Sequence, residues 1–132
     1  AISLHAANDE TRRKLVPGLR DSLDDLIIAL KKYPMPKRRR IIVEYVLVKD
    51  VNDSDQDARA LAKLLSTLPC KVNLLPLNAH DMTDLLPPDE QRVLAFQHML
   101  LENGISAFFR KRRGEDIGAA CGQLLSFKQT PR

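Results

Sequence analysis

Residues 41–48 are the stretch of this sequence that restricts the fold most. They read Ile-Ile-Val-Glu-Tyr-Val-Leu-Val, an almost continuous run of β-branched and other apolar side chains. A strand without alternation of apolar and polar residues is buried on both faces, which is typical of a parallel sheet covered by helices. Only Glu44 interrupts the run. Because a buried carboxylate must be paired or must face a cavity, Glu44 is either half of a structural ion pair or a site residue.

Helical patterns separate this strand from three other strand-like runs. We expect the strands at residues 1–5, 41–48, 72–77 and 105–109. A short helix is expected after Asn8-Asp9-Glu10, and longer helices are expected to begin at Asp21-Ser22, Asn52-Asp53-Ser54 and Pro87-Pro88-Asp89-Glu90. The order β-α-β-α-β-α-β predicts consecutive parallel strands joined by right-handed crossovers. The 132 residues contain no linker or repeat, so we expect a single segment of α/β structure.

Polar residues stand where several of these strands end. Ser3 and His5 close the first strand, Asn78 follows the third, and the segment around Cys121 follows the fourth. In folds of this type the carboxyl ends of the strands face the ligand, so these residues are the first candidates for a binding site. For His5 taken alone, a surface or core histidine stays an open alternative.

Cys121 lies in a stretch of unusual composition. Small residues surround it at 118–120 and at Gly122, and the basic run Arg110, Lys111, Arg112, Arg113 precedes it. Small neighbours leave the sulfur accessible to a bound molecule, and nearby arginines favour the thiolate over the thiol. The alternative is a small buried hydrophobe near a helix end, because free cysteine is among the most buried residue types.

The basic residues are clustered. The formal net charge is +4, and the runs 37–40 and 110–113 hold eight of the twenty-one lysines and arginines. Such runs are either solvated flanks that keep strands from aggregating or contacts to a polyanion such as RNA. For the second reading the candidates are Lys37, Arg38, Arg39 and the run Arg110–Arg113. Aromatic residues make up only 5% of the chain, so base stacking is expected to be minor.

Other function classes find no support in the sequence. It contains no phosphate-binding loop, no GxGxxG and no GxSxG. His80 and His98 have no metal-ligand spacing with Cys70 or Cys121, so no metal site is expected in this segment. No apolar run approaches the ~18 residues of a membrane span, and two distant cysteines indicate a reducing compartment. We therefore expect a cytoplasmic location and no membrane partner.

Several stretches form a longer pattern that runs from end to end of the chain. They are Ser3-Leu4-His5-Ala6, Asn8-Asp9-Glu10, Leu15-Val16-Pro17, Glu44-Tyr45-Val46, Val51-Asn52-Asp53, Pro69-Cys70-Lys71-Val72-Asn73-Leu74, Asn78, and the motif from Arg113-Gly114 through Asp116-Ile117 to Ala119-Ala120-Cys121-Gly122-Gln123-Leu124. This pattern resembles the radical S-adenosylmethionine (SAM) RNA methyltransferases, which act on carbon 2 of an adenine in 23S rRNA and in tRNA.

The resemblance implies the C-terminal part of a (βα)6 partial barrel, the radical SAM fold. Ser3, Leu4, His5 and Asn78, within residues 1–80, would contact SAM, and Cys121, in a loop at 110–125, would carry the methyl group as S-methylcysteine. A [4Fe-4S] cluster, bound by residues upstream of this segment, would cleave a second SAM to a radical that activates this methyl group for addition to adenine. The implied partners are 23S rRNA, tRNA and an electron donor for the cluster.

The sequence departs from the family pattern in two places that matter. After Asn78 it has Ala79-His80-Asp81-Met82 instead of a Pro-Phe-Pro-Gly loop, which leaves a radical SAM paralogue with another substrate as an alternative. It also lacks the CxxxCxxC cluster motif, which leaves a non-catalytic α/β RNA-binding module as a second one. We expect the missing N-terminal half of the same chain to carry that motif and the 132 residues alone to be inactive. An apolar sheet face bearing Ile42 or Val46 should then be exposed.

Overall fold

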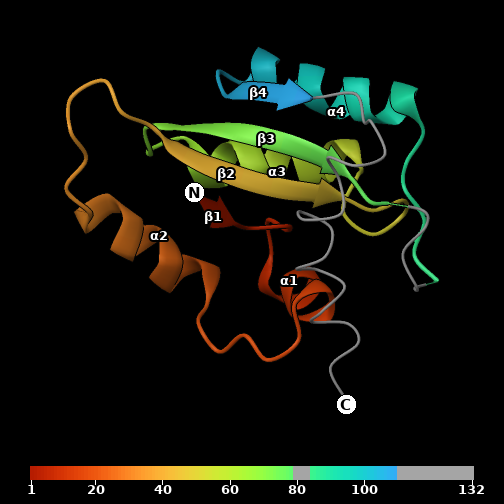
Figure 1. Cartoon of the computed structure of the whole chain (residues 1–132), viewed down its shortest axis with the longest axis horizontal. Coiled ribbons are helices and arrows are strands. Elements are labelled where there is room, and N and C mark those ends of the chain that lie inside the picture. Colours follow the sequence, from red (N-terminus) through yellow and green to blue (C-terminus); the bar gives the residue numbers. More distant parts are fainter. Residues whose placement is uncertain (79–83, 110–132) are drawn as a thin grey trace.

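The computed structural model describes residues 1–78 and 84–109. Its elements are β1 (Ile2–Ser3), α1 (Asp9–Leu15), α2 (Leu23–Lys32), β2 (Ile41–Leu47), α3 (Asp55–Leu65), β3 (Cys70–Pro76), α4 (Glu90–Glu102) and β4 (Ser106–Phe109). All the strand pairs are parallel, and the strands lie side by side in the order β1-β2-β3-β4 (Figure 1). The predicted α/β class with consecutive parallel strands is therefore confirmed.

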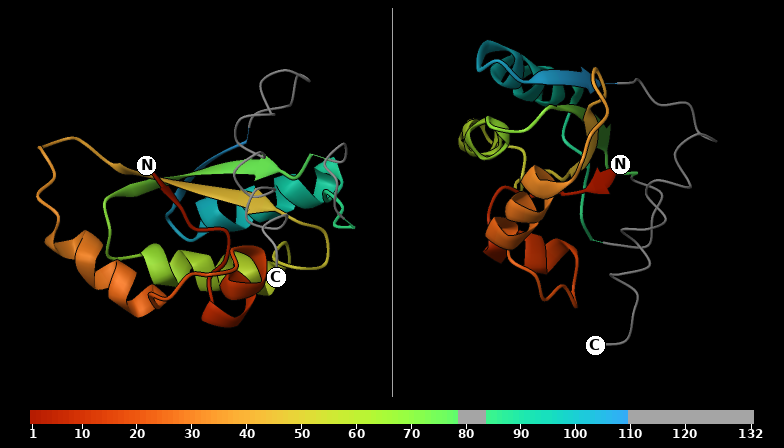
Figure 2. Two further views of the ribbon diagram at one scale, coloured as in Figure 1. Left: turned by 60° about the horizontal axis from the view of Figure 1, so that its bottom comes forward. Right: turned by 90° about the vertical axis from the view of Figure 1, so that its left-hand side faces the viewer.

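The helices α2, α3 and α4 cover one face of the sheet, as the right-hand view of Figure 2 shows. We call this the helix face. Alternate residues of β2 point to it, and Val43, Tyr45 and Leu47 are completely buried there. The ring of Tyr45 lies against Phe96 of α4, with ring centroids 5.3 Å apart. Burial of such large side chains is what holds a helix layer on a sheet.

Side-chain caps fix where the longer helices begin. Ser22, Ser54 and Asp89 each accept a hydrogen bond from the main-chain N–H three residues later, which satisfies one of the free donors of the first turn. At α3 the cap is reciprocal, since the carboxylate of Asp57 also accepts from the N–H of Ser54 at 3.1 Å. Of the three predicted capping residues of α3, only Ser54 is the N-cap. Asn52 has a different role, described below.

The other side of the sheet, which we call the open face, bears Ile42, Glu44, Lys71, Asn73 and Phe108. None of the described helices packs over its amino-terminal half, and Ile42 and Phe108 are 37% and 52% exposed. The expectation of an exposed apolar face holds for Ile42 but is wrong for Val46, which is 1% exposed. Val46 belongs to a second apolar cluster with Leu15, Val16, Val48 and Leu77, formed where the end of α1 packs against the ends of the strands.

No helix within residues 1–78 and 84–109 is long and apolar enough to cross a membrane.

Candidate functional site

The parallel strands all end on one side, the carboxyl end of the sheet, and two of the predicted site segments meet there around β2. On one side of β2, Ser3 is aligned with Glu44, and the N–H of Leu4 donates to the carbonyl oxygen of Glu44 at 2.9 Å. On the other side, the N–H of Leu77 donates to the carbonyl oxygen of Leu47 at 3.0 Å, which carries Asn78 to the same end. Ser3–His5 and Asn78 therefore flank the last residues of β2.

These residues differ in what they offer to a ligand. Ser3 is exposed and Asn78 is half-buried. The side chain of Leu4 is completely buried in the helix-face core, and its carbonyl oxygen accepts a hydrogen bond from Nε of the buried Arg12 at 3.2 Å. The polar groups at this end thus come from Ser3, His5 and Asn78, while Leu4 anchors the segment.

His5 is buried, and its imidazole is tied to β2. Its Nδ1 accepts a hydrogen bond from the N–H of Val46 at 3.0 Å, so a neutral ring carries its proton on Nε2. Burial, with a smaller contribution from the charge of Arg12, lowers the pKa of His5 from 6.5 to about 4. The main chain of His5 has φ of 63°, a left-handed conformation that is uncommon for a residue with a side chain. At physiological pH His5 is therefore neutral, and its ring is fixed by the hydrogen bond from Val46.

The buried side chain of Asn52 joins several main-chain segments at this end of the sheet. It lies in the connection between β2 and α3, and it is 0% exposed. Its Nδ2 donates to the carbonyl oxygens of His5 and Val46, and its Oδ1 accepts from the N–H of Val48, all at 2.7 Å. The pattern of the sequence predicted a helix cap here. Ser54 followed three positions later by Asp57 is the pattern of a capping box, and it indicates that the cap lies at Ser54 rather than at Asn52.

Glu44 lies on the open face in a row that crosses the whole sheet. The register aligns Ser3 with Glu44, Glu44 with Asn73, and Asn73 with Phe108. Within the described residues Glu44 makes no ion pair, so the structural pair considered from sequence is not seen there. Its half-buried carboxylate instead extends the polar surface from Ser3 toward β3.

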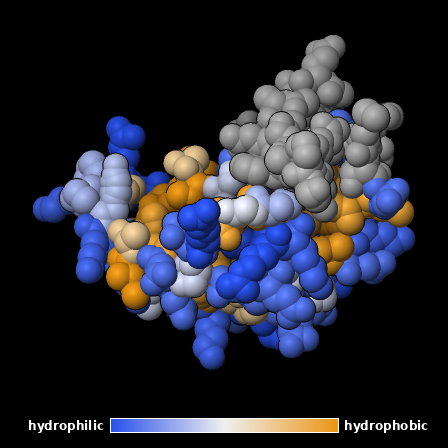
Figure 3. Space-filling view, turned by 90° about the horizontal axis from the view of Figure 1, so that it is seen from below, coloured by the Kyte–Doolittle hydropathy of each residue, from blue (hydrophilic) through white to orange (hydrophobic). Residues whose placement is uncertain are grey.

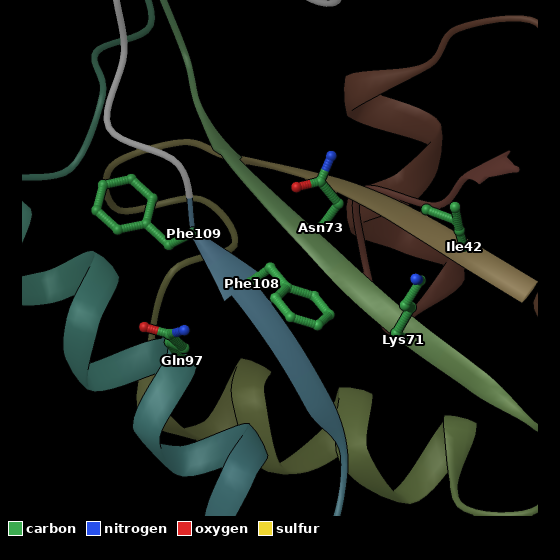
Figure 4. Close-up of a pocket in the computed structure, with 6 residues that line it drawn as sticks. All are labelled: Ile42, Lys71, Asn73, Gln97, Phe108 and Phe109. Atoms are coloured by element: carbon green, nitrogen blue, oxygen red, sulfur yellow. The ribbon is translucent and has the colours of Figure 1, made fainter. Parts of the chain in front are cut away.

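A groove of about 420 Å³ lies beside this row, toward β4 (Figure 4). It is lined by Ile42, Lys71, Asn73, Gln97, Phe108 and Phe109. Lys71 stands over the ring of Phe108, with Nζ 5.8 Å from the ring centroid. Gln97 is engaged in the packing of α4, since its Nε2 donates to the carbonyl oxygen of Ala107 at 2.9 Å. The sequence analysis placed Ile42 on an exposed apolar face and Lys71 and Asn73 in the family pattern, but it assigned none of the lining residues to a binding site.

The structure separates the first basic run from the candidate site. Lys37, Arg38 and Arg39 are exposed in the connection between α2 and β2, at the amino end of the sheet. In Figure 3 hydrophilic side chains project from the left-hand end of the molecule, where Figure 1 places this connection. Arg40 is anchored to β4, because its Nη1 donates to Oγ of Ser106 at 3.2 Å. These residues therefore lie at the opposite end from Ser3–His5 and Asn78.

Other predicted residues lie outside the described part of the chain. They are Cys121, Arg110, Lys111, Arg112, Arg113 and the residues 79–82 after Asn78. The second cysteine, Cys70, begins β3 and packs in the helix-face core, as expected, and burial raises the pKa of its thiol. Residues 1–78 and 84–109 contain no group of three histidine, cysteine or acidic side chains that could hold a metal ion.

No family model matches the chain. Curated proteins do match it over its whole length. It is 52% identical over 133 residues to the dual-specificity RNA methyltransferase RlmN of Sorangium cellulosum, covering 100% of this chain and 34% of that protein. It is 49% identical over 131 residues to the protein of the same name from Desulfotalea psychrophila, covering 98% of this chain and 36% of that protein. The chain thus spans about a third of the length of these relatives.

Solved structures agree with the sequence matches. A radical SAM methyltransferase from Sphaerobacter thermophilus superposes on 92% of this chain with a TM-score of 0.82 and 46% identity, and the match covers 36% of that protein. A domain of a pyruvate-formate lyase-activating enzyme from Bacteroides vulgatus matches 83% of the chain with a TM-score of 0.65. At 17% identity, the second likeness speaks for the fold alone. The strand order seen here is therefore that of a segment of a radical SAM methyltransferase fold.

Proposed function

We propose, on the premise that this chain belongs to the family of the dual-specificity RNA methyltransferases, that its protein transfers a methyl group from SAM to carbon 2 of an adenine in RNA. The observation that carries the proposal is the meeting of Ser3–His5 and Asn78 around the end of β2, in a chain 52% identical to such an enzyme. The carboxyl end of parallel strands is where folds of this class bind their ligands. A paralogue with another substrate and a non-catalytic module are not favoured by these relatives.

The polar groups at the carboxyl end fit SAM as a ligand. Ser3 offers an exposed hydroxyl group, Asn78 a half-buried amide, and His5 a ring whose neutral form does not repel the positively charged sulfonium. In this proposal Ser3, His5 and Asn78 bind and orient SAM. Leu4, whose side chain is part of the core, contributes through the position of its main chain.

Cys121 is the proposed carrier of the methyl group. Its thiolate attacks the sulfonium methyl carbon, a new carbon–sulfur bond forms as the sulfonium bond breaks, and Cys121 becomes a thioether. A [4Fe-4S] cluster with a second SAM supplies the radical that activates this methyl group. The chain cannot hold that cluster, because it has two cysteines and one of them, Cys70, is buried in the core. The cluster ligands are therefore proposed to lie outside these 132 residues, and an electron donor must reach them.

The substrates proposed are 23S rRNA and tRNA, bound through the exposed Lys37, Arg38 and Arg39 and through Arg110–Arg113. A cytoplasmic location, where both RNAs are made, fits this assignment. The test is nucleoside mass spectrometry of both RNAs from cells without the gene, complemented with the wild type, Cys121→Ala or Cys70→Ala. We expect 2-methyladenosine to return with the wild type and with Cys70→Ala, but not with Cys121→Ala. Unchanged 2-methyladenosine in cells without the gene would overturn the proposal.

A further inference from the structure

We infer that Asn52 is the positioning residue of the SAM site, fixing His5 and the end of β1 against β2 through its side-chain amide. The inference rests on the proposed function, because it assumes that Ser3–His5 contact SAM. It adds a residue that makes no contact with the ligand in this assignment. Asn52 acts through its hydrogen bonds to the main chain of His5, Val46 and Val48.

Strand β1 is too short to fix its carboxyl end by ladder hydrogen bonds alone. The ladder between β1 and β2 aligns only Ile2 with Val43 and Ser3 with Glu44. Beyond these pairs, side chains take the place of main-chain partners in the hydrogen bonds. The N–H of Val46 is bonded by the imidazole of His5, and the carbonyl oxygens of Val46 and His5 are both bonded by Nδ2 of Asn52. Asn52 therefore closes the ladder at the point where the chain leaves the sheet.

The amide of Asn52 satisfies all three of its main-chain partners. Two of them are carbonyl oxygens, which need donors, and the third is the N–H of Val48, which needs an acceptor. The amide supplies two hydrogens and one oxygen, and these fixed partners determine which side is Nδ2. An aspartate would set a carboxylate against two carbonyl oxygens. An alanine would leave three main-chain groups unpaired in a site that is 0% exposed.

The main chain of His5 must be held in its conformation by other residues. Its φ of 63° is a conformation that a histidine keeps only when the surroundings impose it. The carbonyl bond from Asn52 and the ring bond from Val46 hold the main chain and the side chain separately. Without Asn52, His5 can relax toward an ordinary φ, which moves Ser3 and the imidazole away from their places beside β2. A displacement of about 1 Å in a positioning shell costs up to about a hundredfold in binding or rate.

Tyr45→Phe is the matched control, because the hydroxyl of Tyr45 donates to the main-chain oxygen of Asn52 at 2.7 Å. That variant removes a buried hydrogen bond at the same residue while leaving the amide of Asn52 in place. Its loss of stability should be smaller than that of Asn52→Ala, because it leaves one main-chain oxygen unpaired rather than three main-chain groups. Only the Asn52 variants remove the bonds to His5 and Val46.

The experiment measures the dissociation constant for SAM by equilibrium dialysis in the protein expressed from its complete gene, with thermal unfolding recorded for each variant. We expect Asn52→Ala to raise this constant by about 10 to 100-fold and Tyr45→Phe by less than about threefold, with each constant measured well below the melting temperature of its variant. If Asn52→Ala does not fold, Asn52→Ser replaces it, because serine buries no charge and its short hydroxyl group removes the amide that joins His5, Val46 and Val48. Equal weakening by Asn52 and Tyr45 variants would reduce Asn52 to a structural residue and overturn the inference.

A second readout reports on His5 directly. Nitrogen-15 NMR of the wild type should show the Nε2–H tautomer, and the Asn52 variants should show exchange between tautomers as the ring loses its place beside Val46. An unchanged single tautomer in the variants would also contradict the inference. If the wild type itself fails to bind SAM, it is the proposed function that fails.

Discussion

At the residue scale, His5 illustrates how an ordinary side chain becomes specialised by its surroundings. Sequence reasoning placed His5 at a strand end and left open whether it is a core residue or a ligand. The structure makes it both buried and part of the candidate site, because its ring replaces a ladder hydrogen bond at the end of β1. A pattern of residues cannot reveal this, since the left-handed φ of His5 depends on contacts with residues 46 and 52, more than forty positions away.

The lowered pKa of His5 predicts a pH dependence of stability. The unfolded chain takes up a proton near pH 6.5, whereas the folded protein does so near pH 4. Between these values the unfolded state binds more protons, so the contribution of a neutral His5 is fully present above pH 6.5 and is lost as the pH falls toward 4. The shift corresponds to a loss on the order of 3 kcal/mol.

Urea unfolding between pH 7 and 4 tests this, with His5→Gln as the variant that cannot titrate. The free energy of unfolding of His5→Gln should fall less steeply with decreasing pH than that of the wild type. His98→Gln is the control, because His98 is exposed on α4 and pairs with Glu102 at the surface. Equal slopes in the wild type and His5→Gln would show that His5 is not held neutral.

At the element scale, the helices show how far sequence patterns reach. The helix starts predicted at Asp21-Ser22 and Pro87-Pro88-Asp89-Glu90 are confirmed, because helix starts depend on neighbours within one turn. The connection after β2 was read less well, since Asn52 bonds to β1 and β2 rather than to α3. The burial of Val46 was also missed. It comes from the packing of α1 on the strand ends, which periodicity within β2 does not encode.

The reciprocal cap of α3 gives a prediction confined to one element. Ser54→Ala removes the hydroxyl that accepts from the N–H of Asp57 at 3.0 Å, and the free energy of unfolding should fall by about 1 kcal/mol. SAM binding should stay unchanged, because α3 begins beyond Asn52 and bears none of the candidate ligands. Gln56→Ala, at an exposed position in the same turn, is the control and should change stability by less than about 0.5 kcal/mol. A loss of SAM binding in Ser54→Ala would link the cap to the site.

At the scale of the whole molecule, the sheet separates two proposed contact regions. The candidate SAM residues lie at its carboxyl end, and Lys37–Arg39 lie at its amino end, separated by strands of seven residues, roughly 20 to 25 Å. An RNA that contacts both regions must span this distance. The run 37–40 directly precedes the strand at 41–48, so the predicted parallel order already implied that it lies at the amino end of the sheet.

The salt dependence of RNA binding tests this arrangement in the complete protein. If the basic runs make about 4 to 6 phosphate contacts, a plot of log affinity against log salt should have a slope of about −3 to −5. Neutralising Lys37, Arg38 and Arg39 with glutamine should make the slope shallower by about 2. The control replaces Lys14, Arg59 and Lys63 with glutamine. This removes the same charge from exposed positions on α1 and α3. Equal effects of both triples would assign Lys37–Arg39 to general attraction rather than to contact.

We propose that this chain provides the methyl-carrying cysteine and the strand ends that hold the methyl donor of an RNA methyltransferase. The most direct measurement is peptide mass spectrometry of the protein purified from cells, comparing Cys121 with Cys70 in the same digest. We predict one added methyl group on Cys121 and none on Cys70, whose thiol is buried with a raised pKa. The methylated fraction of Cys121 should fall in Asn52→Ala. An unmodified Cys121 in protein that is active on RNA would contradict the claim.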